Sequence, residues 1–167
     1  MKKVLMILFV ACTIGVSLGS AQKMTKGTSL VNVGLGVVPG VGVNVSYDYG
    51  LVDTWGPGIF TIGGFIGYQN WGDSYYYRNV GSDYRVNEFA FAPRATYRYA
   101  INNSFEVYGA VAMGFRIESY SKYLDNETDF YMSTTAGCRY TFTKNISVFA
   151  EVGWNLAYLN GGISFAF

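Results

Sequence analysis

The sequence predicts an all-β fold, an eight-stranded antiparallel up-and-down transmembrane β-barrel, from three observations. Apolar residues recur at every second position along most of the chain after residue 26, where we find no helical periodicity. Only 14% of the 167 residues are charged, whereas soluble domains carry roughly a quarter. The chain is also rich in aromatic residues, at 18%, and contains 21 glycines, a composition typical of strands that cross a membrane.

The chain begins with a segment that has the order of a secretory signal peptide. Lys2–Lys3 is positively charged, Val4–Val16 is an almost unbroken apolar run, and small residues precede Gln22. We therefore expect residues 1–21 to be a signal peptide that is cleaved before Gln22, and residues 22–167 to form the barrel domain.

Two other interpretations of this segment fit the sequence less well. The stretch Val4–Ala21 is uncharged and near the minimum length of a transmembrane helix, but glycine and serine dilute its end. Phe9–Cys12 resembles a lipoprotein cleavage motif, with an unusual phenylalanine at its first position and a cysteine that lies early in the chain. Cleavage without lipidation is therefore the expectation.

The first four predicted strands follow from alternating apolar residues. They occupy the odd positions of Val31–Val37 and of Val41–Tyr49, with mostly small or polar residues between them. Phe, Ile and Tyr take even positions in residues 60–69, and Phe, Ala and Tyr take odd positions in residues 88–99. Pro93 cannot donate a hydrogen bond to a neighbouring strand, so we expect a bulge or a locally broken bond pair there.

The last four predicted strands show the same alternation over residues 105–118, 129–142, 146–156 and 159–167. In the third of these, the apolar face runs through to Leu156. An even number of strands, each near the length that a tilted strand needs to cross a bilayer, is typical of outer-membrane barrels.

The apolar face of each strand is predicted to point outward into lipid. The opposite face carries mostly Gly, Ala, Ser, Thr and Asn, whereas the surface of a soluble lipocalin-like barrel would be rich in Lys and Glu. An eight-stranded interior has room only for side chains, so small residues fit there and the bulky set does not. Lipid also forces closure, because an open sheet edge would leave unpaired backbone groups in hydrocarbon.

The connections predict the orientation of the barrel. Asn70–Arg85 and Ser119–Thr128 are long and polar, whereas Gly50–Gly58, Ala100–Ser104 and Thr143–Asn145 are shorter. Long loops face the exterior and short turns face the periplasm in outer-membrane barrels. We therefore expect a bacterial outer-membrane location, with both termini periplasmic and the long loops extracellular. Aromatic residues near the short turns form the expected girdle: Tyr47, Tyr49, Tyr97, Tyr99, Tyr140, Phe142, Phe165 and Phe167.

The turn at residues 101–103 predicts a register for the strands on either side of it. If Ala100 faces Ser104, facing residues have numbers that add up to 204. The expected inward pairs are then Arg98 with Glu106 and Glu88 with Arg116, and the expected outward pairs are Tyr99 with Phe105, Phe91 with Met113 and Phe89 with Phe115. This register matches opposite charges inside, and a slip by one residue would reverse every face.

Charged residues on the inward faces are candidates for an interior network: Glu88, Arg94, Arg98, Glu106, Arg116, Glu118, Arg139 and Glu151, together with Asp48 and Asp129. Such residues could line a channel, but the narrow bore of eight strands favours a plug of ion pairs. Unpaired charges inside would be costly, so we expect each to have a partner.

The long loops contain the binding candidates. These are Trp71, Tyr75, Tyr76, Tyr77, Arg78, Tyr84 and Arg85 in the first loop, and Tyr120 and Tyr123 in the second. Tyr, Trp and Arg are enriched at binding hot spots. The alternative is that several of these tyrosines extend the strands above the membrane and lie among headgroups. The strands around the first loop could also continue outward as a ribbon with an edge that pairs with a partner strand.

With its signal peptide, eight alternating segments and aromatic girdle, the chain resembles the small eight-stranded outer-membrane barrels of the OmpA/OmpX type. The alternating ending Ile163, Phe165 and Phe167 matches the C-terminal motif of that family, which implies recognition by the barrel-assembly machinery. Unlike OmpA itself, the chain is expected to have no periplasmic peptidoglycan-binding domain after Phe167. This resemblance implies an architecture and leaves the function open.

Composition makes several other functions unfavourable. The net charge of +1 gives no basic excess for nucleic acid, and the absence of histidine removes the usual base of a hydrolytic triad. Gly34–Gly40 lacks the strand-to-helix setting of a dinucleotide loop, and Asp125–Asp129 lacks the turn glycine of a calcium loop. We expect no cofactor or metal.

The sequence thus favours a monomeric, non-enzymatic protein in contact with outer-membrane lipid and lipopolysaccharide. Its expected role is structural or adhesin-like, through extracellular loops that bind a protein or glycan. The alternative is a narrow channel for ions or small solutes.

Overall fold

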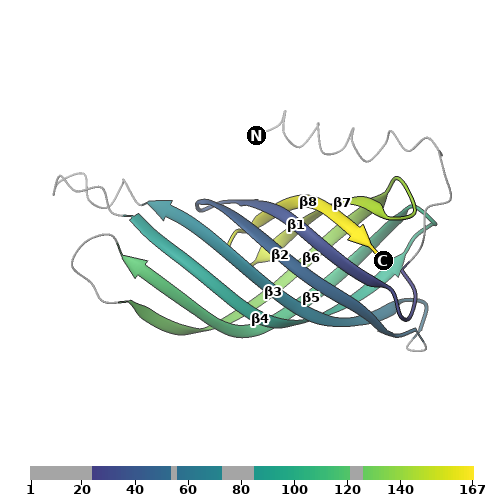
Figure 1. Ribbon diagram of the computed structural model, residues 1–167, viewed down its shortest axis with the longest axis horizontal. Coiled ribbons are helices and arrows are strands. Elements are labelled where there is room, and N and C mark those ends of the chain that lie inside the picture. The colour runs from purple at the N-terminus through teal and green to yellow at the C-terminus, as the bar shows by residue number, and fades with distance from the viewer. Residues whose placement is uncertain (1–23, 54–55, 73–84, 121–125) are drawn as a thin grey trace.

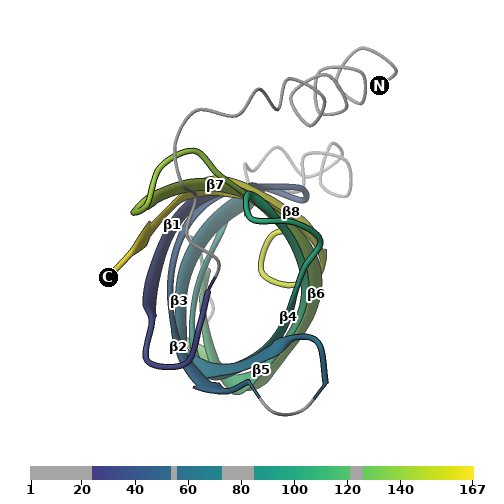
Figure 2. The ribbon, with the colours of Figure 1, turned by 90° about the vertical axis from the view of Figure 1, so that its right-hand side faces the viewer.

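The computed structural model describes residues 24–53, 56–72, 85–120 and 126–167. They form eight antiparallel strands: β1 (Ser29–Val37), β2 (Val41–Val52), β3 (Ile59–Gly72), β4 (Arg85–Ala100), β5 (Phe105–Tyr120), β6 (Glu127–Thr141), β7 (Ile146–Trp154) and β8 (Leu159–Ala166). Each strand pairs with the next and β1 pairs with β8, which closes the barrel (Figure 1 and Figure 2). The predicted fold class is confirmed. The predicted signal peptide, residues 1–21, lies outside the described residues.

The predicted facing of the strands is also confirmed. Large apolar side chains cover the outside of the wall, as at Met113, which is 56% exposed. Polar and charged side chains such as Asp48 and Arg98 are buried in the interior. The described chain contains no helix that is long and apolar enough to span a membrane.

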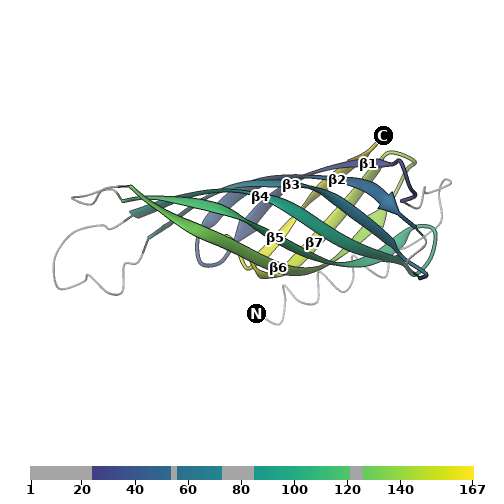
Figure 3. The same ribbon diagram turned by 90° about the horizontal axis from the view of Figure 1, so that it is seen from below.

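Strands β3 to β6 are longer than the others and project beyond them. β4 and β5 have 16 residues each, whereas β7 has 9 and β8 has 8. Their extra length lies at the end of the barrel opposite Phe167, which we call the loop end; the other end is the terminal end (Figure 1 and Figure 3).

The predicted loops Asn70–Arg85 and Ser119–Thr128 are longer than the connections in the structure, because the strands on both sides extend into them. The ladder between β3 and β4 continues to Gly72 and Arg85, and Glu127 already belongs to β6. Polar residues there mark the limit of the apolar wall, whereas backbone hydrogen bonds continue the strands past it.

The predicted register of β4 and β5 is wrong by two residues. Facing residues add up to 206, because Ala100 faces Glu106. The Asn102 side chain accepts hydrogen bonds from the backbone N–H groups of Ser104 (2.9 Å) and Phe105 (2.8 Å), so the turn takes in Phe105. A shift of two keeps every side chain on its predicted face. The observed pairs are Tyr99 with Val107, Phe91 with Phe115, Phe89 with Ile117, Arg98 with Tyr108 and Glu88 with Glu118.

Pro93 interrupts one ladder without shifting it. It faces Gly64 on β3, but no pair is formed with β5 at Ala92 or Pro93. The register is the same on both sides of this gap. Pro93 therefore makes a locally broken bond pair and no bulge, as expected from its missing N–H group.

The corrected register can be tested with engineered cysteines in a Cys138→Ala background. The pair Phe89→Cys with Ile117→Cys should form a disulfide under mild oxidation, because directly facing Cα atoms in an antiparallel pair lie about 4.5–5.5 Å apart. The control pair, Phe89→Cys with Phe115→Cys, should stay reduced, because diagonal neighbours lie about 7–8 Å apart. Mobility on a non-reducing gel distinguishes the two pairs. Cross-linking of the control pair alone would contradict the observed register and would support the predicted one, in which the numbers of facing residues add up to 204.

Candidate functional site

Arg98 is the most constrained charge in the barrel interior. Its side chain on β4 is only 2% exposed and lies between two carboxylates. It donates hydrogen bonds to Asp48 on β2 (2.6 Å) and to Glu106 on β5 (2.7 Å). Arg139 on β6 reaches the other oxygen of Glu106 at 2.8 Å. A chain of alternating charges therefore crosses the lumen and links four strands.

Arg94 extends this chain to β7. It forms an ion pair with Glu151, which also accepts a hydrogen bond from the hydroxyl of Tyr108 at 3.0 Å. The guanidinium of Arg98 lies 4.4 Å from the centre of the Tyr108 ring, a cation–π contact. We call Asp48, Arg94, Arg98, Glu106, Arg139 and Glu151 the charged layer. It is balanced, with three arginines and three carboxylates, as burial away from water requires.

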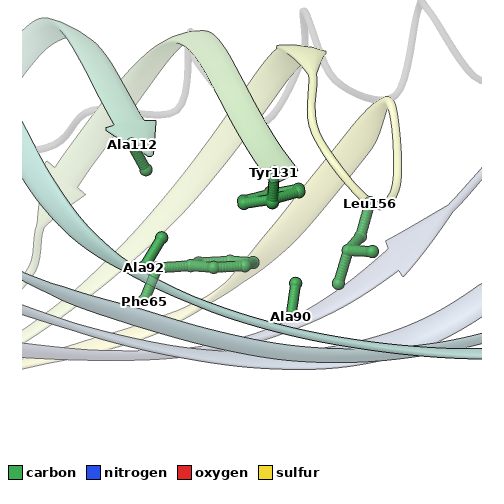
Figure 4. Close-up of a cluster of buried hydrophobic side chains, with 6 residues drawn as sticks. All are labelled: Phe65, Ala90, Ala92, Ala112, Tyr131 and Leu156. Carbon is green, nitrogen blue, oxygen red and sulfur yellow. The ribbon is translucent and has the colours of Figure 1, made fainter. Parts of the chain in front are cut away.

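An apolar layer lies beside the charged layer, toward the loop end. Phe65 stacks on Tyr131 with ring centres 6.0 Å apart, and Leu156 packs with them (Figure 4). The remaining members are alanines at positions 90, 92 and 112. Gly67 makes room for this packing, because a Cβ there would lie 2.7 Å from both the Phe65 ring and a methyl group of Leu156.

Little free space remains where the apolar layer meets β1, β2 and β8. The cavity beside Phe65 and Asn160 measures about 10 Å³, and a site for one water molecule needs about 10–15 Å³. Along β4, the inward residues run in the order Arg98, Thr96, Arg94, Ala92, Ala90 and Glu88. From the terminal end toward the loop end, charged side chains therefore fill the lumen first, and apolar side chains follow.

A second charged group, the rim cluster, lies at the loop end. Arg116 approaches Glu118 at 2.8 Å and both Glu88 and Asp129 at 3.6 Å. The indole of Trp71 lies beside the carboxylate of Glu88. In the part of the chain that the structure describes, the rim cluster has three carboxylates around one guanidinium, and the side chain of Arg116 is 34% exposed.

The eight residues predicted as an interior network thus fall into two groups, separated by the apolar layer. Arg94, Arg98, Glu106, Arg139 and Glu151 are in the charged layer, and Glu88, Arg116 and Glu118 are in the rim cluster. Both ion pairs expected between β4 and β5 are present, Arg98 with Glu106 and Glu88 with Arg116. They join diagonal neighbours, because the directly facing residues are offset by two.

The binding candidates of the long loops are only partly described. Trp71 lies at the mouth of the lumen and Arg85 is exposed at the start of β4. The backbone of Tyr120 pairs with Val86 as the last residue of β5. The other candidates, Tyr75, Tyr76, Tyr77, Arg78, Tyr84 and Tyr123, lie outside the described residues. The C-terminal motif Ile163, Phe165 and Phe167 presents all three side chains on the outer wall.

The expected outward position of Leu156 is wrong. It was assigned to the outward face of a strand ending at residue 156, but β7 ends at Trp154 and Leu156 is buried in the lumen. Sequence reasoning also gave no role to Tyr108, Tyr131 and Phe65. Their presence as bulky aromatics on a face of small residues was the signal that could have identified them as lumen-filling side chains.

Removal of Arg98 tests how much stability the charged layer supplies. Arg98→Ala should lower the free energy of unfolding by about 3–5 kcal/mol, because it strands two buried carboxylates. Urea titration of the protein in lipid vesicles measures this, with the exposed Lys144→Ala as the control that should change little. A loss for Arg98→Ala no larger than that for the control would mean that the layer does not hold the barrel together.

Comparison with known proteins agrees with this architecture. A de novo designed transmembrane β-barrel matches with a TM-score of 0.55 at 17% identity, over 87% of this chain and 100% of the design. The N-terminal β-barrel domain of OprF from Pseudomonas aeruginosa matches with a TM-score of 0.55 at 13% identity, over 86% and 100% of the two chains. Ail, the attachment invasion locus protein of Yersinia pestis, solved with the heparin analogue sucrose octasulfate, gives 0.54 at 13% over the same shares.

These identities show the fold alone. No curated protein matches the sequence. The model of the family described as the outer membrane protein β-barrel domain matches residues 8–164, which is nearly the whole chain. The resemblance to small outer-membrane barrels is confirmed, and the chain belongs to the family of outer membrane protein β-barrel domains.

Proposed function

We propose that this protein is a non-catalytic surface protein of the bacterial outer membrane that binds an extracellular protein through the projecting part of β3 to β6. The observation that carries the proposal is the combination of a filled lumen with a sheet that rises past the rest of the wall. A filled lumen leaves the loop end as the part of the barrel that is free to meet a ligand.

The unpaired edge of β6 supports the orientation. Its residues Glu127–Ser133 pair with β5 but with no strand on the other side in the described chain, since the first pair with β7 is Thr134 with Trp154. Open sheet edges do not occur in hydrocarbon, so this edge lies outside the bilayer core. The longer connections also lie at this end, and long loops face the exterior in outer-membrane barrels, which supports a loop end that faces outward and a terminal end that faces the periplasm.

The contents of the lumen argue against the alternative of a channel. A conducting path needs continuous water-filled space, whereas the charged and apolar layers pack the bore of the barrel. An enzymatic role also lacks support, because the sequence has no histidine for a triad.

The charge of the loop end favours a protein ligand over a sulfated glycan. Segments 71–88 and 116–129 together contain seven acidic and four basic residues, a net charge of −3. Ail was solved with a polyanionic heparin analogue, but a negative surface repels polyanions. It complements a basic patch on a protein.

The wall and the closing strand fit the expected membrane partners. A groove of about 510 Å³ between Tyr97, Ala136 and Leu159 offers space to acyl chains of lipid or lipopolysaccharide. Phe165 on β8 lies between Val31 and Ile146 in the closed wall, where the barrel-assembly machinery would complete the sheet. The barrel closes on itself, which fits a monomer.

Trimming the projecting hairpins tests this function. Asn-Gly turns replace residues 71–86 between Asn70 and Asn87, and residues 118–127 between Ile117 and Thr128, which are facing pairs. The trimmed barrel should still shift in mobility between unboiled and boiled gels. Adhesion of cells that express it to immobilised extracellular-matrix proteins should fall by about tenfold or more, as expected if hot-spot contacts are lost.

The matched control carries Asn-Gly in place of Thr143–Lys144 at the terminal end and should keep full adhesion. Adhesion that survives trimming would contradict the proposal. Adhesion to heparin alone, with none to protein, would contradict the choice of ligand class.

A further inference from the structure

The strand β7 leaves the wall early and opens a gap beside β6. At Gly153 the backbone has a φ of +154°, and a Cβ there would lie 2.3 Å from the carbonyl oxygen of Thr134. The chain then turns inward and buries Leu156, and the N–H of Tyr158 donates a hydrogen bond to Val38 at 2.8 Å. Among the described residues, therefore, no strand pairs with this side of β6 between Glu127 and Ser133.

A cavity of about 770 Å³ occupies this gap. On one side it is lined by wall residues that point outward: Phe130, Met132 and Trp154, which are 67%, 58% and 75% exposed. On the other side it is lined by Trp71 and Glu88, which point into the lumen. The cavity thus passes around the free edge of β6 from the outer wall to the lumen mouth, and we call it the side slot.

The floor of the side slot is closed. Leu156 and Tyr131 line it from below and belong to the apolar layer that fills the lumen. A molecule that enters from the membrane side can therefore reach the rim cluster but cannot pass through the barrel. The volume of the side slot falls in the range of about 300–1,000 Å³ that is usual for small-molecule sites.

The inner end of the side slot favours a cation. Among the described residues of the rim cluster, the guanidinium of Arg116 is shared by the carboxylates of Glu88, Glu118 and Asp129. A further anion would meet this surplus of negative charge, whereas a cation would offset it. The indole of Trp71 beside Glu88 adds an aromatic surface, and aromatic rings with a carboxylate are the usual receptors of ammonium groups.

We propose that the side slot binds an ammonium amphiphile, a molecule with one positively charged ammonium group and a single alkyl chain. The ammonium group lies at Glu88 and Trp71, and the chain runs out over Met132 and Trp154 toward the outer leaflet. Trp71 belongs to the projecting part of β3, but the ligand here is a small amphiphile that enters through the gap beside β6, so this site goes beyond the proposed binding of an extracellular protein.

Tryptophan fluorescence tests the proposal, because Trp71 and Trp154 both line the side slot. The protein, with its third tryptophan replaced as Trp55→Phe, is placed in phospholipid nanodiscs. It is titrated below micellar concentration with dodecyltrimethylammonium, dodecyl sulfate and dodecyl maltoside. The ammonium probe should bind saturably at one site and about tenfold more tightly than either other probe, as expected for one charge contact.

Two variants and one control locate the site. Glu88→Gln should weaken binding of the ammonium probe about tenfold, and Met132→Trp should abolish it by filling the side slot. Glu127→Gln removes a charge from the same end of β6, outside the slot lining, and should change affinity less than about twofold. Each variant is first checked for the mobility shift on heating. Equal binding of all three probes, or unchanged affinity in both slot variants, would overturn the proposal.

Discussion

The buried guanidinium of Arg98 constrains the rest of this barrel. A charge with 2% exposure in a narrow lumen must have partners at hydrogen-bond distance, and Asp48 and Glu106 are held at 2.6 and 2.7 Å from it. Asp48 lies on β2 and Glu106 lies on β5. Arg139 on β6 pairs with Glu106, and Arg94 pairs with Glu151 on β7, so the same need for charge partners extends to these two strands. The polar interior is therefore one interdependent unit, and the apolar residues are left to face lipid.

The division between wall and lumen explains why sequence alone predicted so much of the fold. A period of two with bulky residues on one face and small or polar residues on the other is required by any narrow barrel in lipid. It therefore appears plainly in segments such as Val41–Tyr49 and 105–118. The inward charges were recognised for the same reason, because Arg94 and Glu151 stand out among small residues.

The remaining features depend on interactions that periodicity does not encode. The register of β4 and β5 is set by the side chain of Asn102, which extends the turn by hydrogen bonds to the backbone. β3 extends to Gly72 and β6 begins at Glu127, because backbone pairing continues past the point where the sequence becomes polar. Leu156 turns inward because Gly153 lets β7 leave the sheet and because Phe65 and Tyr131 offer it an apolar surface. The inward turn of the chain after Gly153 also creates the side slot, because the segment that places Leu156 in the lumen leaves a gap in the wall beside β6.

The central claim is that paired charges and apolar side chains seal the lumen, so that any function lies at the loop end. Single-channel recording of the purified protein in planar lipid bilayers tests it most directly. We expect no steady conductance from the wild-type protein, because buried ion pairs cross the narrow lumen in the charged layer. A large and stable conductance with uniform steps would contradict the sealed lumen and would make the barrel a channel.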